Sequence, residues 1–210
     1  MRLYSYFRSS AAFRVRIALN LKGLDYEIVA TNLLEDQQRS QAYLRINPQG
    51  LVPALEVDDG KILTQSPAIL EWLEERFPAP ALYPADPLAR ARMRAICFTV
   101  ACDIHPINNL RVLKYLGDEL GVDGEARNDW YRHWMRLGLA AAEPAIVGPF
   151  CAGSEPAMTD VYLIPQVYNA LRYRLDMTEF PRLSAAYGHA LQHDAFAAAH
   201  PDRQPDTPAA

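Results

Sequence analysis

The sequence is poor in cysteine, and its three cysteines form no common motif. Cys97, Cys102 and Cys151 are odd in number, and no two of them stand in a Cys-x-x-Cys pair. Such a set predicts neither a disulfide framework nor a zinc site, and no metal site is expected elsewhere. We interpret the three side chains as small buried hydrophobic groups.

Long apolar runs and an excess of basic charge are also missing. No apolar run reaches the roughly 18 residues that a membrane-spanning helix needs. Arg8, Arg14 and Arg16 interrupt the N-terminal segment, where a signal peptide would need a continuous apolar core. The 21 basic and 25 acidic residues give a net charge of −4, which provides no field to attract a nucleic acid. We therefore expect a cytoplasmic protein without nucleic-acid or membrane partners.

The N-terminal part of the chain has the pattern of a βαβ unit. Residues 2–7 alternate and are rich in aromatic side chains, which predicts a strand. Apolar residues at every fourth position over 13–21 predict a helix whose other faces carry Arg14 and Arg16. Residues 26–31 again have the composition of a strand. A strand, a helix and a strand in about 30 residues predict a βαβ unit.

A short helix, two strands and a longer helix are expected next. Residues 38–46 predict the short helix, and residues 51–55 and 61–63 predict two strands joined by a tight turn. The longer helix is predicted to begin with Ser66 as its N-cap and Pro67 at its first helical position.

The composition changes at the proline-rich segment 78–87, which we interpret as a linker between two domains. Beyond it the apolar pattern is helical, and helices are expected at residues 88–117, 125–147, 158–174 and 183–199. The polar tail after residue 199 is expected to be held only in part. The predicted outline is a small α/β domain over residues 1–80, followed by an all-α domain over residues 88–210.

Three short segments contain residues suited to an anionic ligand. Ser9-Ser10 and Gln65-Ser66 each lie where a predicted helix begins. Hydroxyl groups there lie beside backbone N–H groups that have no intrahelical partner, at the positive end of the helix dipole. Helix capping alone is the simpler explanation for each serine taken by itself. Val52-Pro53 lies between two predicted strands, where a cis proline would expose the backbone of Val52 to a ligand.

Together these segments resemble a known family. Residues 9–19 read Ser-Ser-Ala-Ala-Phe-Arg-Val-Arg-Ile-Ala-Leu. This segment closely resembles the Ser-Ser-Cys-x-Trp-Arg-Val-Arg-Ile-Ala-Leu signature of the zeta-class glutathione transferases. Further segments resemble the same family in the same order, at residues 47–53, 65–69, 103–111, 165–170 and 203–206. The resemblance therefore covers nearly the whole chain.

The resemblance implies the glutathione-transferase fold, with an α/β thioredoxin-like N-terminal domain, an all-α C-terminal domain and a homodimeric assembly. Glutathione would be the cofactor, with its sulfur near Ser9-Ser10 and its γ-glutamyl end held by Gln65-Ser66. Its cysteinyl unit would pair with the backbone of Val52, before a cis Pro53. The residues implied for the glutathione site are Ser9, Ser10, Ala11, Ala12, Phe13, Arg14, Gln38, Val52, Pro53, Gln65, Ser66, His105, Asn109, Leu110 and Arg111.

The implied reaction is the cis–trans isomerisation of a small dicarboxylic acid. A free thiol has a pKa of about 8.5, and lowering it by about 2 takes roughly 2.7 kcal/mol, which a hydroxyl and a helix start are expected to supply. The thiolate adds to the cis double bond, the bond rotates, and expulsion of the thiolate leaves the trans alkene. The substrate's two carboxylates need cationic partners, and the candidates are Arg8, Arg111 and Arg172. Without the resemblance each would be interpreted as a solvated surface arginine.

Three positions depart from the family pattern. Ala11 stands where the signature has cysteine. This change argues against glutaredoxin-like thiol transfer but permits isomerisation, because glutathione supplies the sulfur. Phe13 stands where the signature has tryptophan. Ala157 stands where the family often has a capping threonine, so either Thr159 or Ser154 caps that helix or the helix is about 1 kcal/mol less stable.

The leading hypothesis is a glutathione-dependent isomerase that converts maleylacetoacetate to fumarylacetoacetate. Maleylpyruvate is the nearest rival substrate, and the sequence does not separate the two. A conjugating transferase of detoxification is a third hypothesis, which the arginines disfavour because they suit small acids. A non-catalytic dimerisation module is a fourth, which the retained serines disfavour.

Overall fold

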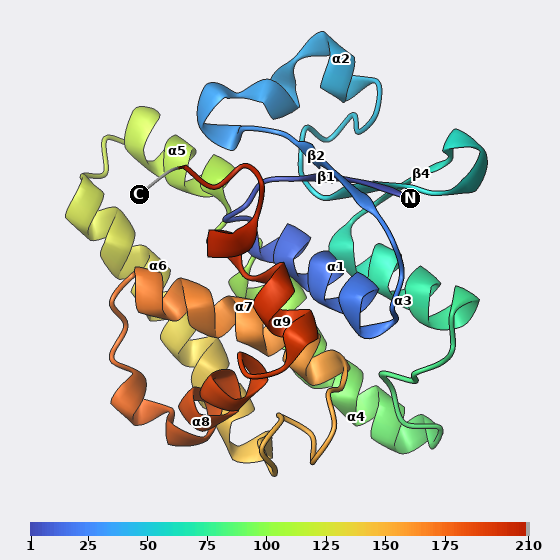
Figure 1. Ribbon diagram of the computed structural model, residues 1–210. Helices are drawn as coiled ribbons and strands as arrows, with labels where there is room; N and C mark the ends of the chain where they lie inside the picture. The colour runs from blue at the N-terminus through green and yellow to red at the C-terminus, as the bar shows by residue number, and fades with distance from the viewer. Residues whose placement is uncertain (209–210) are drawn as a thin grey trace. The chain divides into compact units, whose positions relative to one another are not determined.

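The computed structural model describes residues 1–208, which form two compact units (Figure 1). The first unit combines Met1–Ala81 with the C-terminal segment that begins at Leu191, and the second unit spans Leu82–Ala190. The expectation of an all-α domain over residues 88–210 is therefore wrong at its C-terminal end, because that segment packs with the first unit.

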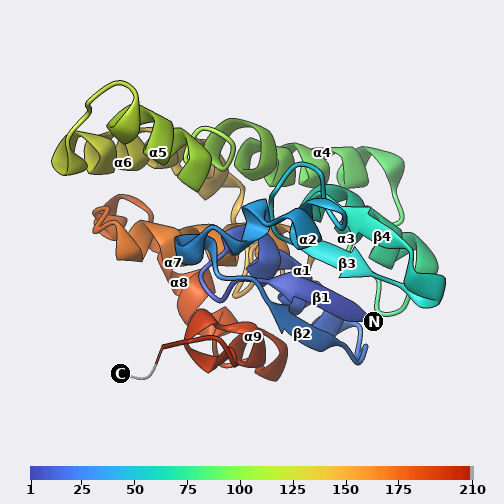
Figure 2. The ribbon, with the colours of Figure 1, turned by 90° about the horizontal axis from the view of Figure 1, so that it is seen from above.

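A four-stranded mixed sheet forms the centre of the first unit. Its strands are β1 (Arg2–Ser5), β2 (Glu27–Ala30), β3 (Ala54–Glu56) and β4 (Ile62–Thr64). The strand order is β2-β1-β3-β4, and β1 pairs in parallel with β2 and antiparallel with β3, as can be followed in Figure 2. The parallel pair confirms the predicted βαβ unit. The third strand begins only at Ala54, because Pro53 has no N–H to donate to the ladder.

The helices of the first unit surround α1. They are α1 (Ser10–Leu21), α2 (Gln41–Leu44), α3 (Ser66–Arg76) and α9 (Asp194–Ala199). Because α1 packs against both α3 and α9, its whole circumference is covered over most of its length. Arg14 and Arg16, which were expected on faces other than the apolar stripe, are therefore buried as well. The predicted helix at residues 38–46 is reduced to α2, which begins where the Ser40 hydroxyl accepts from the N–H of Tyr43.

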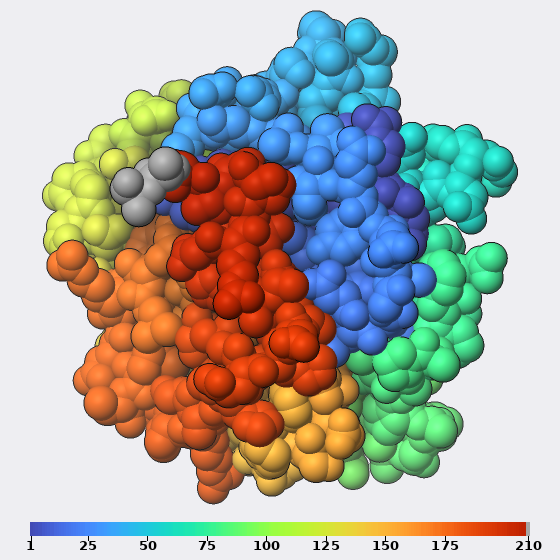
Figure 3. Space-filling view, viewed as in Figure 1, coloured from blue at the N-terminus to red at the C-terminus, as the bar shows by residue number. Residues whose placement is uncertain are grey.

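Arg16 joins the C-terminal segment to the start of the chain. Its Nε donates to the carbonyl of Ala199 at 3.0 Å, while its two terminal nitrogens donate to Ser5 Oγ and to the carbonyl of Phe7, each at 3.0 Å. The N–H of Phe7 donates to Asp206 Oδ2 at 2.8 Å. Figure 3 shows this segment, in red, directly against blue N-terminal residues. The tail is thus held more firmly than expected, through charged hydrogen bonds that its composition does not reveal.

The second unit is helical. Its elements are α4 (Pro87–Phe98), a π-helix (Thr99–Ile104), α5 (Leu110–Asp118), α6 (Gly124–Ala142), α7 (Met158–Arg172) and α8 (Pro181–Ala190). Short 3-10 helices across the chain lie at Leu33–Glu35, Gln37–Arg39, Asp58–Gly60, Glu143–Ala145, Met177–Glu179 and Pro201–Arg203.

Two of the predicted long helices are broken. The helix expected at residues 88–117 is interrupted between the π-helix and α5, because Pro106 lacks an N–H and Asn109 starts a new helix. Asn109 Oδ1 accepts from the N–H of Arg111 at 3.1 Å, as an N-cap does. The helix expected at residues 183–199 is divided into α8 and α9, and His193 caps the second piece.

An aspartate in the first turn fixes the chain just before α7, where the N-cap position lacks a side-chain bond. Ala157 occupies the N-cap position without a side-chain bond, and neither Thr159 nor Ser154 replaces it there. Instead the buried carboxylate of Asp160 accepts from the N–H of Cys151 at 2.7 Å and from that of Ala157 at 2.9 Å. Desolvation by burial raises the pKa of Asp160. The carboxylate therefore ties the loop before α7 to the first turn of that helix.

The cysteines follow the expected pattern at two positions. Cys97 and Cys151 are buried, and burial raises the pKa of the Cys151 thiol. Cys102 is exposed, so the expectation of three buried thiols is wrong there. Its position on the π-helix, between the buried Val100 and Ile104, leaves it outside the core.

We expect His200 to make the first unit sensitive to acid. Its Nδ1 accepts from the N–H of Asp202 at 3.3 Å, and its ring meets Phe13 edge-on with 6.0 Å between centroids. Desolvation by burial lowers the pKa of His200 below its ordinary value of 6.5. A lowered pKa means that stability present above pH 6.5 is lost as the pH falls, since the unfolded chain binds the proton more readily.

Urea unfolding measured from pH 8 down to pH 5 should show this loss for the wild type. It should be smaller for His200→Asn, which retains an acceptor but does not titrate in this range. His133→Asn, a change at an exposed histidine, serves as the control. Equal pH dependence in all three proteins would contradict this role of His200.

Candidate active site

The start of α1 places a serine hydroxyl beside the positive end of the helix. Ser9 is the N-cap residue, and its Oγ accepts from the N–H of Ala12 at 3.2 Å. A serine hydroxyl has two acceptor positions and one donor, so this cap leaves the O–H of Ser9 able to donate. Ser9 is half-buried, whereas Ser10, the first residue of the helix, is buried. Ser9 is therefore the serine better placed to meet an anionic ligand.

The signature residues that follow the serines belong to the core. Ala11, Ala12 and Phe13 are buried, so they shape the helix start without presenting polar side chains. Arg14 is also buried, and its Nη1 donates to Ser66 Oγ at 3.3 Å. This contact brings the starts of α1 and α3 together, and it adds a full positive charge to the two positive helix ends.

The start of α3 differs in one detail from its prediction. Gln65, not Ser66, occupies the N-cap position, with φ of 66°, and Ser66 is the first residue of the helix. The left-handed backbone at Gln65 turns its side chain outward, where its amide nitrogen donates to Gln49 Oε1 at 2.7 Å. Gln65 is exposed and Ser66 is buried, so the pair offers one accessible amide beside a free helix end.

The Val52–Pro53 peptide bond is cis, as the resemblance implies. Pro53 is buried, and the side chain of Val52 packs against the cluster formed by Tyr4, Tyr43 and Ala54. The loop before it is held at the carbonyl of Leu51, which accepts from Tyr43 Oη and from Asn47 Nδ2, each at 2.7 Å. Desolvation by burial raises the pKa of Tyr43, which keeps this phenol protonated as a donor.

Sequence reasoning assigned no role to Tyr43 or Asn47, whose side chains both donate to the carbonyl of Leu51. Both fix the loop that presents the backbone of Val52. The spacing signal that could have identified Asn47 is its place just before Pro48, where asparagine commonly closes a turn; its Oδ1 indeed accepts from the N–H of Gln49 at 3.1 Å.

The two remaining candidates of the first unit have different partners. Gln38 is buried; its Nε2 donates to Asp36 Oδ1 at 3.0 Å, while its Oε1 is buried without a hydrogen-bond partner among the residues described. Arg8 is half-buried, and its Nη2 donates to Tyr6 Oη at 3.1 Å, with its guanidinium 5.2 Å from the ring of Phe7. The guanidinium of Arg8 therefore packs against the neighbouring aromatic rings of Tyr6 and Phe7.

In the second unit the turn from His105 to Asn109 joins the π-helix to α5. His105 and Asn109 lie in this turn, and Leu110 and Arg111 are the first two residues of α5. His105 and Leu110 are half-buried, and Arg111 is exposed. The turn is held by α6, because Trp130 Nε1 donates to the carbonyl of Ile107 at 2.9 Å.

Arg172 is the last residue of α7 and is exposed. Its Nη1 donates to Asn169 Oδ1 at 3.1 Å, and its guanidinium lies 5.2 Å from the ring centroid of Tyr173. Both contacts come from its own helix end, so they limit the directions that the guanidinium can take.

Two other kinds of site are absent from residues 1–208. Within residues 1–208, histidine, cysteine, aspartate and glutamate side chains do not gather into a group of three or more that could hold a metal ion. In the same part of the chain, no helix combines the length and the apolar character needed to cross a membrane.

Comparison with known proteins gives consistent matches. Residues 8–76 match the family model of the glutathione S-transferase N-terminal domain. The chain is 51% identical to the maleylacetoacetate isomerase of Pseudomonas aeruginosa, over 100% of both chains. It is 44% identical to the maleylpyruvate isomerase of a Ralstonia species, over 99% of this chain and 100% of the relative.

A solved structure agrees with these matches. The crystal structure of maleylacetoacetate isomerase from Methylobacterium extorquens AM1, with bound malonate and glutathione, superposes with a TM-score of 0.95. The two sequences are 41% identical, and the match covers 100% of both chains.

Proposed function

Because the chain belongs to the zeta-class glutathione transferase family that contains the maleylacetoacetate and maleylpyruvate isomerases, we propose that it converts maleylacetoacetate to fumarylacetoacetate with glutathione as cofactor. We also propose that it acts in the cytoplasm as a homodimer. The observation that carries the function is the start of α1, where Ser9 caps the helix through its oxygen while its O–H stays able to donate.

The residues present fit glutathione. The buried Oε1 of Gln38 lacks a hydrogen-bond partner in the described chain, and the tripeptide has amide donors to offer it. The starts of α1 and α3, joined by Arg14 and Ser66, suit its negative groups. When bound, glutathione supplies the sulfur nucleophile that makes rotation about the cis double bond possible.

Each group of residues has a separate task in this proposal. The O–H of Ser9 donates to the sulfur and holds it ionised, with the helix dipole of α1 behind it. The backbone of Val52 pairs with the cysteinyl unit, and Gln65-Ser66 hold the γ-glutamyl end. The same cofactor role is proposed for the remaining residues of the family pattern, which are Ser10, Ala11, Ala12, Phe13, Arg14, Gln38, Pro53, His105, Asn109, Leu110 and Arg111.

The substrate's carboxylates require cations. We propose Arg172 as the main partner, because it is exposed and its guanidinium is directed by Asn169 and Tyr173. Arg111, also exposed, is the second candidate. Arg8 is the third, and it would have to leave Tyr6 to bind a carboxylate, which makes it the weakest of the three.

Maleylpyruvate remains a second candidate substrate, because a relative of similar identity is named for it. Assays of the purified protein with glutathione on both acids test the proposal. We expect kcat/KM to be at least about 10-fold higher for maleylacetoacetate, since the tail beyond the alkene adds contact area. The reverse preference would assign the second substrate, and activity on neither would contradict both.

The same preparation separates the remaining hypotheses. Turnover of a chloro-dinitro aromatic far above any isomerase activity would favour a conjugating transferase. Failure to bind glutathione in calorimetry would favour a non-catalytic module.

A further inference from the structure

At the end of α7, Arg172 is followed by Tyr173, the C-cap residue of the helix. The ring of Tyr173 stacks face to face on the ring of Tyr131, which comes from the middle of α6, with 3.6 Å between centroids and 5° between planes. Tyr131 is buried, so the stack is anchored in the second unit. The guanidinium of Arg172 lies on the same Tyr173 ring at 5.2 Å. The order of contacts is therefore Tyr131, then Tyr173, then Arg172.

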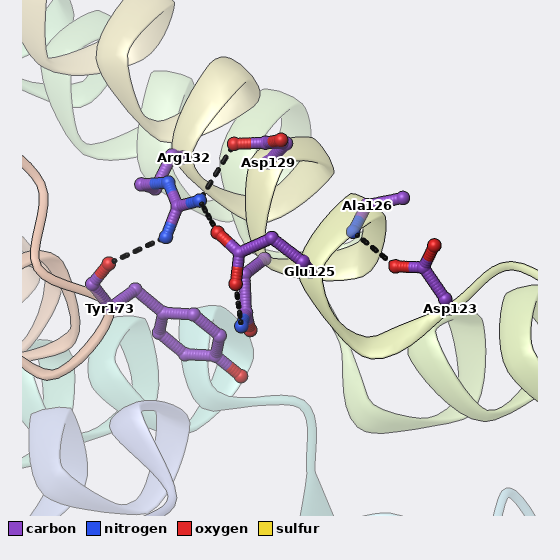
Figure 4. A network of polar contacts seen from close by, with 7 residues as sticks. Asp123, Glu125, Ala126, Asp129, Arg132 and Tyr173 are labelled. Atoms are coloured by element: carbon purple, nitrogen blue, oxygen red, sulfur yellow. Dashed lines mark hydrogen bonds and ion pairs between the residues drawn. The ribbon is translucent and has the colours of Figure 1, made fainter.

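The backbone beside this stack is fixed by a charged cluster. Arg132 Nη1 donates to the carbonyl of Tyr173 at 3.3 Å, as Figure 4 shows. The other terminal nitrogen of Arg132 is held by Glu125 Oε1 and Asp129 Oδ1, each at 2.6 Å. The two carboxylates direct the guanidinium toward the end of α7, so that α6 holds the Tyr173 carbonyl as well as its ring.

The same stretch of α6 holds the turn that joins the π-helix to α5. The carbonyl of Tyr131 accepts from Asn108 Nδ2 at 3.2 Å, and Trp130 donates to the carbonyl of Ile107. About two turns further along, a Cβ at Gly138 would clash with Ile104 Cδ1, which shows how closely α6 approaches the π-helix. Tyr131 thus contacts the turn through its backbone and Tyr173 through its ring.

From this geometry we propose that Tyr131 is a positioning residue for substrate binding. Its ring holds Tyr173, and Tyr173 holds the guanidinium of Arg172 in one direction relative to the turn at residues 105–109. A side chain ordered before binding loses less conformational entropy when the carboxylate arrives. The inference rests on the proposed function, because it requires Arg172 to bind a carboxylate of the substrate.

Binding of malonate to the protein saturated with glutathione tests the inference without relying on turnover. Isothermal calorimetry should give an affinity about fivefold weaker for Tyr131→Leu, which loses the stacked ring. Tyr131→Phe retains the ring and should stay within about twofold of the wild type. Phe150→Leu removes another buried ring of the second unit, one that packs on His189, and should also leave malonate affinity unchanged.

A double-mutant cycle with Arg172→Ala shows whether the effect passes through the arginine. Arg172→Ala alone should weaken malonate binding at least about 10-fold, and adding Tyr131→Leu should weaken it no further. In steady-state assays Tyr131→Leu should raise KM for the dicarboxylic acid while kcat, KM for glutathione and the pKa of the bound thiol stay unchanged.

Three results would overturn the positioning role: wild-type affinity in Tyr131→Leu, an equal loss in Tyr131→Phe, or a full additional loss in the double variant. The assay on the two maleyl acids tests the proposed function separately. An inactive wild type whose malonate binding still follows the expected pattern would overturn the function and leave the positioning role standing.

Discussion

Replacing Ser9 with alanine is expected to lower kcat/KM for isomerisation at pH 7 by roughly 20-fold, because a bound thiol whose pKa rises from about 6.5 to about 8.5 changes from mostly ionised to only a few per cent thiolate. A hydrogen bond to a charged group contributes about 1.5–3 kcal/mol, and losing one from the thiolate should raise the pKa of bound glutathione by about 1 to 2. The helix dipole of α1 remains in the variant and continues to stabilise the thiolate. The variant therefore loses only the stabilisation that the Ser9 hydroxyl provides. The measurement is the ultraviolet absorbance of bound thiolate as a function of pH, together with the rate.

The sign of the pH dependence follows from the same argument. A raised thiol pKa means that less thiolate is present at pH 7, and that the deficit shrinks as the pH rises. The rate of Ser9→Ala should therefore approach that of the wild type above about pH 9, where even a thiol with the ordinary pKa of about 8.5 is mostly ionised. A deficit that stayed constant with pH would show that Ser9 does not act on thiol ionisation.

Two control variants separate the hydroxyl from the cap. Ser9→Ala also removes the bond to the N–H of Ala12, which costs about 1 kcal/mol of stability but does not by itself change chemistry in the folded enzyme. Ser9→Thr retains both the cap and an O–H, and should preserve most of the activity. Ser10→Ala changes a buried hydroxyl and is expected to lower the rate less than 10-fold. A larger loss in Ser10→Ala than in Ser9→Ala would reverse the assignment.

The sequence predicts the first unit well wherever local chemistry determines the structure. The alternating residues before Ser9 and the periodic stripe after it determine β1 and α1, and the serine marks their junction. The cis bond at Val52–Pro53 is a different case, because the base rate of cis proline is about 5–6% and only the family resemblance predicts it.

The sequence pattern does not reveal which side chains are buried by segments from distant parts of the chain. A single stripe of apolar residues predicts one buried face for α1, yet Arg14 and Arg16 are buried on others. Packing against α9 covers Arg16, and α9 comes from the far end of the chain. The guanidinium of Arg16 donates to two carbonyls and a hydroxyl, and charge patterning gives no sign of bonds to such neutral acceptors.

The supporting residues of the candidate site were missed for a related reason. Asn108, Trp130 and Tyr131 act through backbone carbonyls and ring stacking across helices, and such contacts have no sequence motif. Resemblance transfers the residues that touch ligands, whereas the contacts that orient them depend on how helices pack. Pro106 could have indicated the break before α5, because a proline inside a predicted helix commonly ends or kinks it.

Asp160→Ala is expected to cause the largest loss of stability of any change considered, roughly 3–4 kcal/mol. The carboxylate accepts from the N–H groups of Cys151 and Ala157, and removing it leaves the first of these donors buried without its partner. Each buried donor left unsatisfied costs about 1–3 kcal/mol. Burial disfavours the ionised form of the Asp160 carboxyl and raises its pKa. This desolvation cost offsets part of the stability that its two hydrogen bonds contribute in the wild type.

Urea unfolding of the glutathione-free protein measures the loss, which corresponds to a Tm lower by about 10 °C for a chain of this size. Asp123→Ala is the matched control, because Asp123 caps α6 through one exposed bond, from the N–H of Ala126 to Oδ1 at 2.8 Å (Figure 4). Losing that exposed cap should cost only about 1 kcal/mol. Asp160→Asn retains one acceptor oxygen and should fall between the two. Equal losses in Asp160→Ala and Asp123→Ala would mean that the carboxylate inside the first turn of α7 is an ordinary cap, and that the loop from Cys151 to Ala157 is held by other contacts.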